Sequence, residues 1–134
     1  MAFVALAILK FILYCLVCFQ APRLLSLATS DRTSFALIWA SARLVLGVVC
    51  AYPAFMAVAW LQNLNVPFEV AYVAVLIALR YALWQFICEA ISQSTKKAIG
   101  KVARQKWVLL GVAASFTVDG AAILAGADNF KFVC

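Results

Sequence analysis

The sequence contains no histidine and few charged residues of any kind. Without histidine, the chain lacks the commonest general base and metal ligand of enzymes. Only 12% of its residues are charged, whereas 68% are hydrophobic. Soluble domains are about half apolar and about a quarter charged. A small soluble domain leaves much of its surface exposed and could not hide so much apolar surface, so the composition predicts an integral membrane protein.

Acidic residues are scarce as well, since 5 Asp and Glu stand against 11 Lys and Arg, for a net charge of +6. Most basic residues lie between or beside apolar runs, so we expect membrane lipids, especially anionic ones, as partners and no nucleic acid. No phosphate-binding glycine-rich loop, nucleophile motif or four-ligand metal set occurs. We therefore expect no enzyme activity, no cofactor and no bound metal.

Four apolar runs fill the chain and predict an all-α fold, an integral membrane bundle of four transmembrane helices in one domain, residues 1–134. The predicted helices cover about residues 2–20, 35–61, 68–91 and 107–127. Because Lys10 lies inside the first run, we expect a retained span rather than a cleaved signal peptide. A re-entrant or interfacial first segment is the alternative. The second run would be roughly 40 Å of helix against a hydrocarbon core of roughly 30 Å, so we expect tilt or a kink at Pro53.

The basic residues also predict an orientation. The first and third loops must share a side, and they carry Arg23 and Arg32 and the basic residues of segment 96–106. The second loop carries no Lys or Arg. By the positive-inside rule we place the basic loops in the cytoplasm and both termini outside, in a plasma or inner membrane.

Ionisable residues inside the apolar runs are the strongest functional signal, because charges are costly at the bilayer centre. Arg80 and Asp119 lie near the middle of consecutive antiparallel helices, so we expect them to form an ion pair. A packing role is our main expectation, and binding or conducting an ion or polar group is the alternative. We expect Lys10 and Arg43 to snorkel to the interface. The alternative is that they attract an anionic partner.

Two further patterns lie on the third and fourth predicted helices. A polar stripe at helical spacing predicts a hydrogen-bonded seam between helices, with the lining of a polar path as the alternative. It comprises Tyr81, Gln85, Glu89 and Ser92. A stripe of small residues on the fourth helix, which includes Gly111, Ser115 and Asp119, predicts a close packing face. The basic segment between these helices predicts membrane anchoring, or docking of acidic lipid or an acidic partner. It comprises Lys96, Lys97, Lys101, Arg104 and Lys106.

Three functions fit these patterns. The first is a small non-enzymatic membrane protein that acts by helix–helix interaction, as an accessory or immunity-type subunit of a membrane complex or by self-assembly as a homo-oligomer. The second is a small oligomeric transporter or channel that uses Arg80 and Asp119. The third is a membrane thiol oxidoreductase that uses Cys15 and Cys18, a C-x-x-C pair that is weak evidence in an apolar helix. We favour the first.

Overall fold

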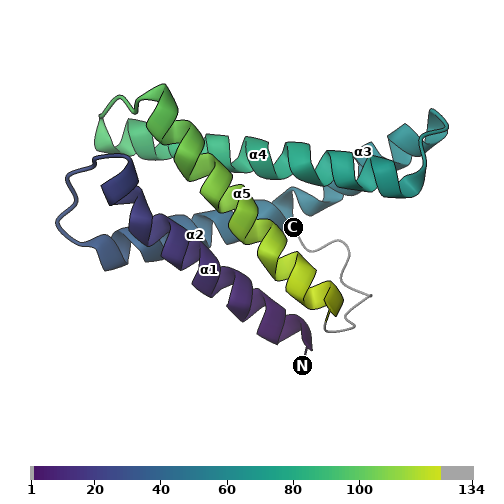
Figure 1. Ribbon diagram of the computed structural model, residues 1–134, viewed down its shortest axis with the longest axis horizontal. Helices are drawn as coiled ribbons and strands as arrows, with labels where there is room; N and C mark the ends of the chain where they lie inside the picture. The colour runs from purple at the N-terminus through teal and green to yellow at the C-terminus, as the bar shows by residue number, and fades with distance from the viewer. Residues whose placement is uncertain (1, 125–134) are drawn as a thin grey trace.

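The computed structural model describes residues 2–124, which form five α-helices and no β-strand (Figure 1). The helices are α1 (Ala2–Leu24), α2 (Arg32–Val49), α3 (Ala51–Asn63), α4 (Phe68–Thr95) and α5 (Lys101–Leu124). The helices α1, α2 and α4 are long and apolar enough to cross a membrane. The predicted all-α class is therefore confirmed, and three helices qualify as spans by length and composition.

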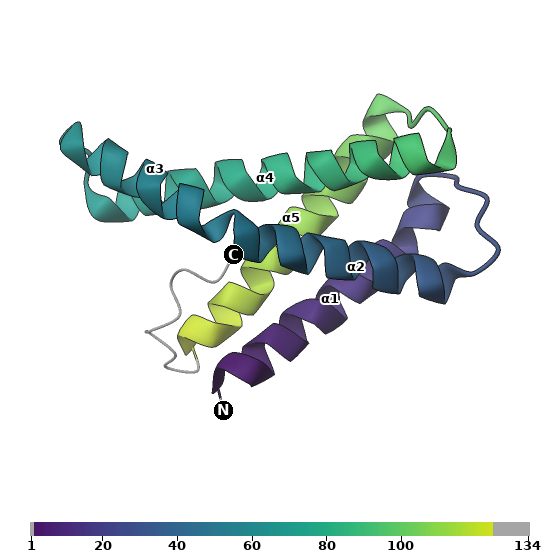
Figure 2. The same ribbon diagram turned by 180° about the vertical axis from the view of Figure 1, so that it is seen from behind.

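The helices diverge from one end of the molecule. The α1–α2 and α4–α5 loops lie together at that end in both ribbon views (Figures 1 and 2). Helix α1 packs against α2 and α5, and α5 packs against α4. Helix α3 packs mainly against the first half of α4, and this hairpin extends away from α1 and α5. We call residues 51–79 the arm.

The core lies where the four longer helices converge, between the loop end and the middle of the molecule. It is built largely from aromatic, aliphatic and small side chains. The largest are Tyr14, Trp84 and Trp107, which are almost completely buried, and Cys18 and Cys88 are buried beside them. Outside this core many large apolar side chains are exposed on every helix. Such a surface is expected of a chain that packs against lipid or other membrane helices.

The second predicted helix, over residues 35–61, is divided into α2 and α3, and the break lies at Cys50 rather than at Pro53. Pro53 is the third residue of α3, a position whose N–H would have no partner inside that helix. An uninterrupted helix would need a donor from residue 53 to the carbonyl of Val49, and proline has none. Cys50 closes α2 by donating to the Leu46 carbonyl at 2.9 Å. The chain therefore restarts its helix just before the proline.

Several helix ends lie beyond the apolar runs that predicted them. Helix α2 begins at Arg32 because Asp31 accepts from the Thr33 and Ser34 amides at 2.9 and 3.3 Å, an N-cap. The Ser34 hydroxyl also donates to Asp31 and helps lower the pKa of that carboxyl. Helix α4 continues to Thr95 and ends where Lys96 takes a left-handed backbone with φ 51°. Helix α5 begins at Lys101, in the basic segment, whose residue types favour helix.

Candidate functional site: a buried cluster of charges and rings

Three ionisable side chains from three helices meet inside the bundle. Asp119 of α5 lies between Lys10 of α1 and Arg80 of α4. Its Oδ1 is 3.0 Å from Lys10 Nζ, and its Oδ2 accepts a hydrogen bond from Arg80. The structure thus places together the two residues that the sequence pairs by depth, and adds Lys10 to them. One carboxylate therefore connects α1 and α4 through α5.

The expectation that Lys10 and Arg43 snorkel to the interface is wrong. Lys10 is 3% exposed and Arg43 is 0% exposed. The Arg43 guanidinium carbon lies 5.2 Å from the Tyr14 ring centre and 5.4 Å from that of Trp84, within range of cation–π attraction. Lys10 contacts Asp119 instead. Both cations turn inward because the bundle offers a carboxylate and electron-rich ring faces at their depth.

A second layer lies directly beside the ion pairs. The Trp84 indole N–H donates to Ser115 Oγ at 3.2 Å, and the Ser115 hydroxyl donates to the Gly111 carbonyl at 2.9 Å. The Tyr14 hydroxyl oxygen lies 3.3 Å from Ser115 Oγ. Because a serine hydroxyl carries one proton and two lone pairs, Ser115 can satisfy all three contacts at once. This buried serine therefore joins α1 and α4 in the same way as Asp119.

Aromatic rings complete the cluster. Trp84 makes edge-to-face contacts with Tyr14 and Trp107, with ring centres 5.5 and 5.2 Å apart. The Trp107 N–H donates to the Val17 carbonyl of α1 at 3.1 Å. The Phe116 ring lies 4.3 Å from the Arg80 guanidinium carbon. Buried rings whose N–H groups are hydrogen-bonded, cations that lie over ring faces, and direct ion pairs are typical of a tightly packed polar core.

The polar stripe on α4 lies at the edge of its contact with α5. Gln85 donates to the Tyr81 hydroxyl at 2.9 Å, and Gln105 of α5 approaches the same oxygen at 3.5 Å. Glu89 forms an ion pair of 2.8 Å with Arg104 of α5. Ser92 donates to the Lys97 carbonyl at 2.6 Å. Two of these contacts, Gln105–Tyr81 and Arg104–Glu89, join α4 to α5, whereas the other two lie within α4 or reach the loop that follows it, and the residues are partly exposed.

The two cysteines of the C-x-x-C pair differ in access. Both are free thiols, with Cys18 fully buried in the core and Cys15 half-buried. A partner disulfide could reach Cys18 only if the core opened. Within residues 2–124, no three Cys, Asp or Glu side chains gather as a metal site would require.

Sequence reasoning missed Tyr14, Trp84 and Trp107 as members of the site. A signal for two of them was present, because Tyr14 follows Lys10 by four residues and Trp84 follows Arg80 by four. Residues four apart share a helix face.

The chain matches no known protein family, no curated protein and no solved structure.

Proposed function

We propose that this chain is a multi-pass membrane subunit that acts by binding a transmembrane helix of a partner chain through its arm, without catalysis. The proposal includes four crossings of the membrane. Helices α1, α4 and α5 each make one crossing, and α2 and α3 together make another. Its support is the apolar arm, whose outer surface is not covered by α1 or α5 within residues 2–124.

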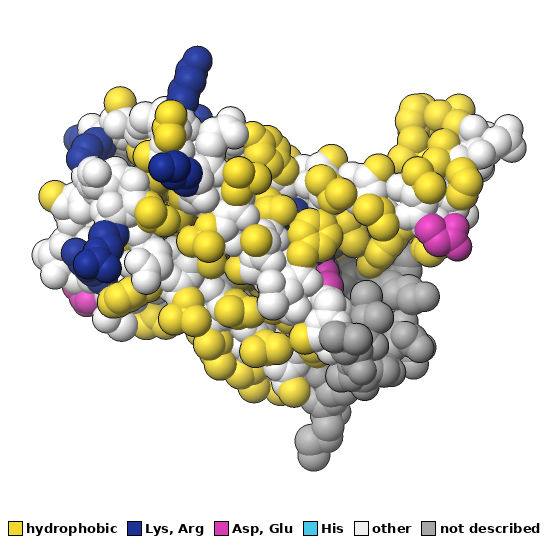
Figure 3. Space-filling view, in the orientation of Figure 1, with side chains coloured by type: hydrophobic (Ala, Val, Ile, Leu, Met, Phe, Trp, Pro, Cys, Tyr) yellow, Lys and Arg dark blue, Asp and Glu magenta, His cyan; other side chains and the backbone are white. Residues whose placement is uncertain are grey.

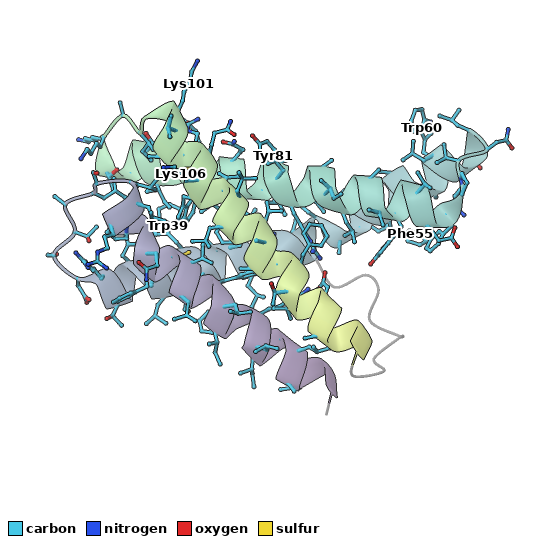
Figure 4. All side chains as sticks on the ribbon, viewed as in Figure 1. Trp39, Phe55, Trp60, Tyr81, Lys101 and Lys106 are labelled. Atoms are coloured by element: carbon cyan, nitrogen blue, oxygen red, sulfur yellow. The ribbon has the colours of Figure 1, made fainter. Side chains whose placement is uncertain are left out.

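The exposed stripe on α3 carries the argument. Tyr52, Met56 and Trp60 follow a spacing of four, and their side chains are 72%, 51% and 62% exposed. Figure 4 shows Trp60 and Phe55 on the arm, far from the basic loops. Aromatic residues and methionine are enriched at protein interfaces. Ala54 and Ala57, half-buried on the same helix, are small enough to permit a close approach.

Tyr52 favours a protein partner over lipid alone. If Trp60 marks the membrane interface, Tyr52 lies eight residues away, about 12 Å deeper along the helix. Its hydroxyl forms no hydrogen bond with any residue of the described part of the chain. A tyrosine hydroxyl that is removed from water usually finds a hydrogen-bond partner, and the hydrocarbon of a membrane offers none. A neighbouring helix would supply the acceptor.

The buried cluster supports this proposal over transport. Lys10 and Arg80 each contact Asp119 directly, and Arg43 lies over the Tyr14 and Trp84 rings. Charges arranged in this way fix the positions of α1, α4 and α5. The buried Cys18 likewise favours packing over thiol exchange.

Photo-crosslinking tests the interaction directly. With p-benzoyl-phenylalanine at Met56, we expect a protein adduct of defined mass in native membranes, because this side chain faces the partner helix. The matched control is Leu16 of α1, whose side chain is similarly exposed at 57% and should give lipid adducts only. The adduct mass distinguishes a second copy from a foreign protein. Lipid adducts alone at both positions would contradict the proposal.

Cysteine labelling tests the orientation. In a cysteine-free background, Leu64→Cys on the α3–α4 turn should react with a membrane-impermeant maleimide added from outside. Lys101→Cys, at the start of α5, should react only after permeabilisation. The expectation follows from the basic residues at the end that carries Lys101. The reverse pattern would invert the proposed orientation, and labelling of both from one side would show that the two ends do not lie on opposite faces.

A further inference from the structure

Basic side chains gather where the α1–α2 and α4–α5 loops meet. The space-filling view shows Lys and Arg concentrated at this end of the molecule (Figure 3). Lys97 donates to the Ser26 carbonyl and so joins the two loops. We call this set the basic end, and its members are Arg23, Arg32, Lys96, Lys97, Lys101, Arg104 and Lys106. The two loops therefore form one surface.

The acidic groups at this end already have partners. Glu89 is paired with Arg104, and Asp31 caps α2, where the Ser34 hydroxyl bond helps hold the pKa of Asp31 below its ordinary value. The exposed cations that remain form no ion pair within residues 2–124. They are Arg23, Arg32, Lys96, Lys101 and Lys106, together with Lys97, which donates to the Ser26 carbonyl. The surface thus keeps a net positive charge after its internal contacts are made.

Helix α5 places these cations next to an apolar surface. Lys106 lies four residues after Val102 and three before Leu109, so the three share the outer face of the helix. Val102 and Leu109 are 68% and 57% exposed. Lys101, five residues before Lys106 at the start of the helix, projects away from the bundle (Figure 4). A cation beside exposed aliphatic side chains fits a molecule that has an anionic head and an apolar tail.

We propose that the basic end is a binding surface for the headgroups of anionic phospholipids, with Lys101 and Lys106 as its main contacts on α5. The phosphate and any further headgroup anion lie against these ammonium groups, and the acyl chains lie along the outer face of α5. The apolar residues on that face select a lipid over a soluble anion. This site is independent of the arm and its partner.

Native mass spectrometry tests the proposal. The protein is reconstituted in nanodiscs of equimolar phosphatidylcholine and phosphatidylglycerol with the same acyl chains, then released into mild detergent. We expect phosphatidylglycerol to be retained in excess. Lys101→Gln with Lys106→Gln should lower that excess about fivefold per lysine, roughly 25-fold in all, the change expected for the loss of two surface cations. Arg23→Gln with Arg32→Gln, on the helix ends that flank the α1–α2 loop, should also lower it.

The matched control is Lys101→Arg with Lys106→Arg, which keeps both charges and should keep the excess. Raising the salt concentration should reduce the excess in the wild type, because exposed charges are screened. Equal retention of both lipids by the wild type would overturn the proposal, as would an unchanged excess in the Gln variants. Loss of the excess on adding inorganic phosphate, but not chloride of equal ionic strength, would assign the surface to a soluble anion instead.

Discussion

Asp119→Leu is expected to lower the free energy of unfolding by about 3–5 kcal/mol, the range found when one partner of a buried ion pair is removed. The reason is that both Lys10 and Arg80 contact this carboxylate. Without it, two cations from different helices face each other inside the bundle. Titration with SDS unfolds the protein from mild detergent, and the unfolding curves of the variant and the wild type measure the loss. Glu69→Gln, at the exposed start of α4, is the matched control and should have little effect.

The shared carboxylate predicts an order of effects that a simple pair would not. Arg80→Leu should cost less than Asp119→Leu, because Asp119 still contacts Lys10. The double variant should be more stable than the sum of the single losses implies, since each change removes the group that the other exposes. Adding Lys10→Met to the double variant should recover more stability. Additive losses would show that the ion pairs do not couple the three helices.

The apolar runs predicted where the helices lie better than where they end. Hydropathy marks the part of a helix that suits lipid, whereas helix ends depend on caps and on residues that favour helix in water. Asp31 starts α2 before the apolar run, and the basic residues after Lys101 extend α5 by more than a turn. The sequence pattern also did not predict the break at Cys50. It indicated a kink at Pro53, but not that one helix would end and a new one begin before the proline.

The ion pair could be predicted because depth alone brings Arg80 and Asp119 to the same level in adjacent antiparallel helices. The positions of Lys10 and Arg43 could not, since they depend on which helix faces which. Helix α5 lies between α1 and α4, and this arrangement turns Lys10 toward Asp119. Hydropathy and spacing give each helix a face but do not choose its neighbour. Which helices lie next to each other is therefore the information that the sequence pattern lacked.

Gly111→Ala is expected to destabilise the protein by about 1–3 kcal/mol, the usual cost of overpacking a core. A Cβ added at this position would lie 2.4 Å from two ring atoms of Trp84. That ring is constrained by edge-to-face contacts with Tyr14 and Trp107 and by its hydrogen bond to Ser115, so moving it would disturb these contacts. The loss opposes helix propensity, which alone would favour alanine by up to about 1 kcal/mol.

Gly120→Ala is the matched control, because it makes the same change on the same helix where a Cβ would meet no atom of the described residues within 4 Å. It should leave stability unchanged or raise it by up to about 1 kcal/mol. Thermal unfolding of both variants in one detergent gives the comparison. Combining Gly111→Ala with Trp84→Phe should cost less than the two single losses together, since the smaller ring leaves room for the new methyl group. If Gly111→Ala were as stable as Gly120→Ala, the close contact between α4 and α5 at Trp84 would be excluded. The packing of the whole buried cluster would then need a different helix arrangement.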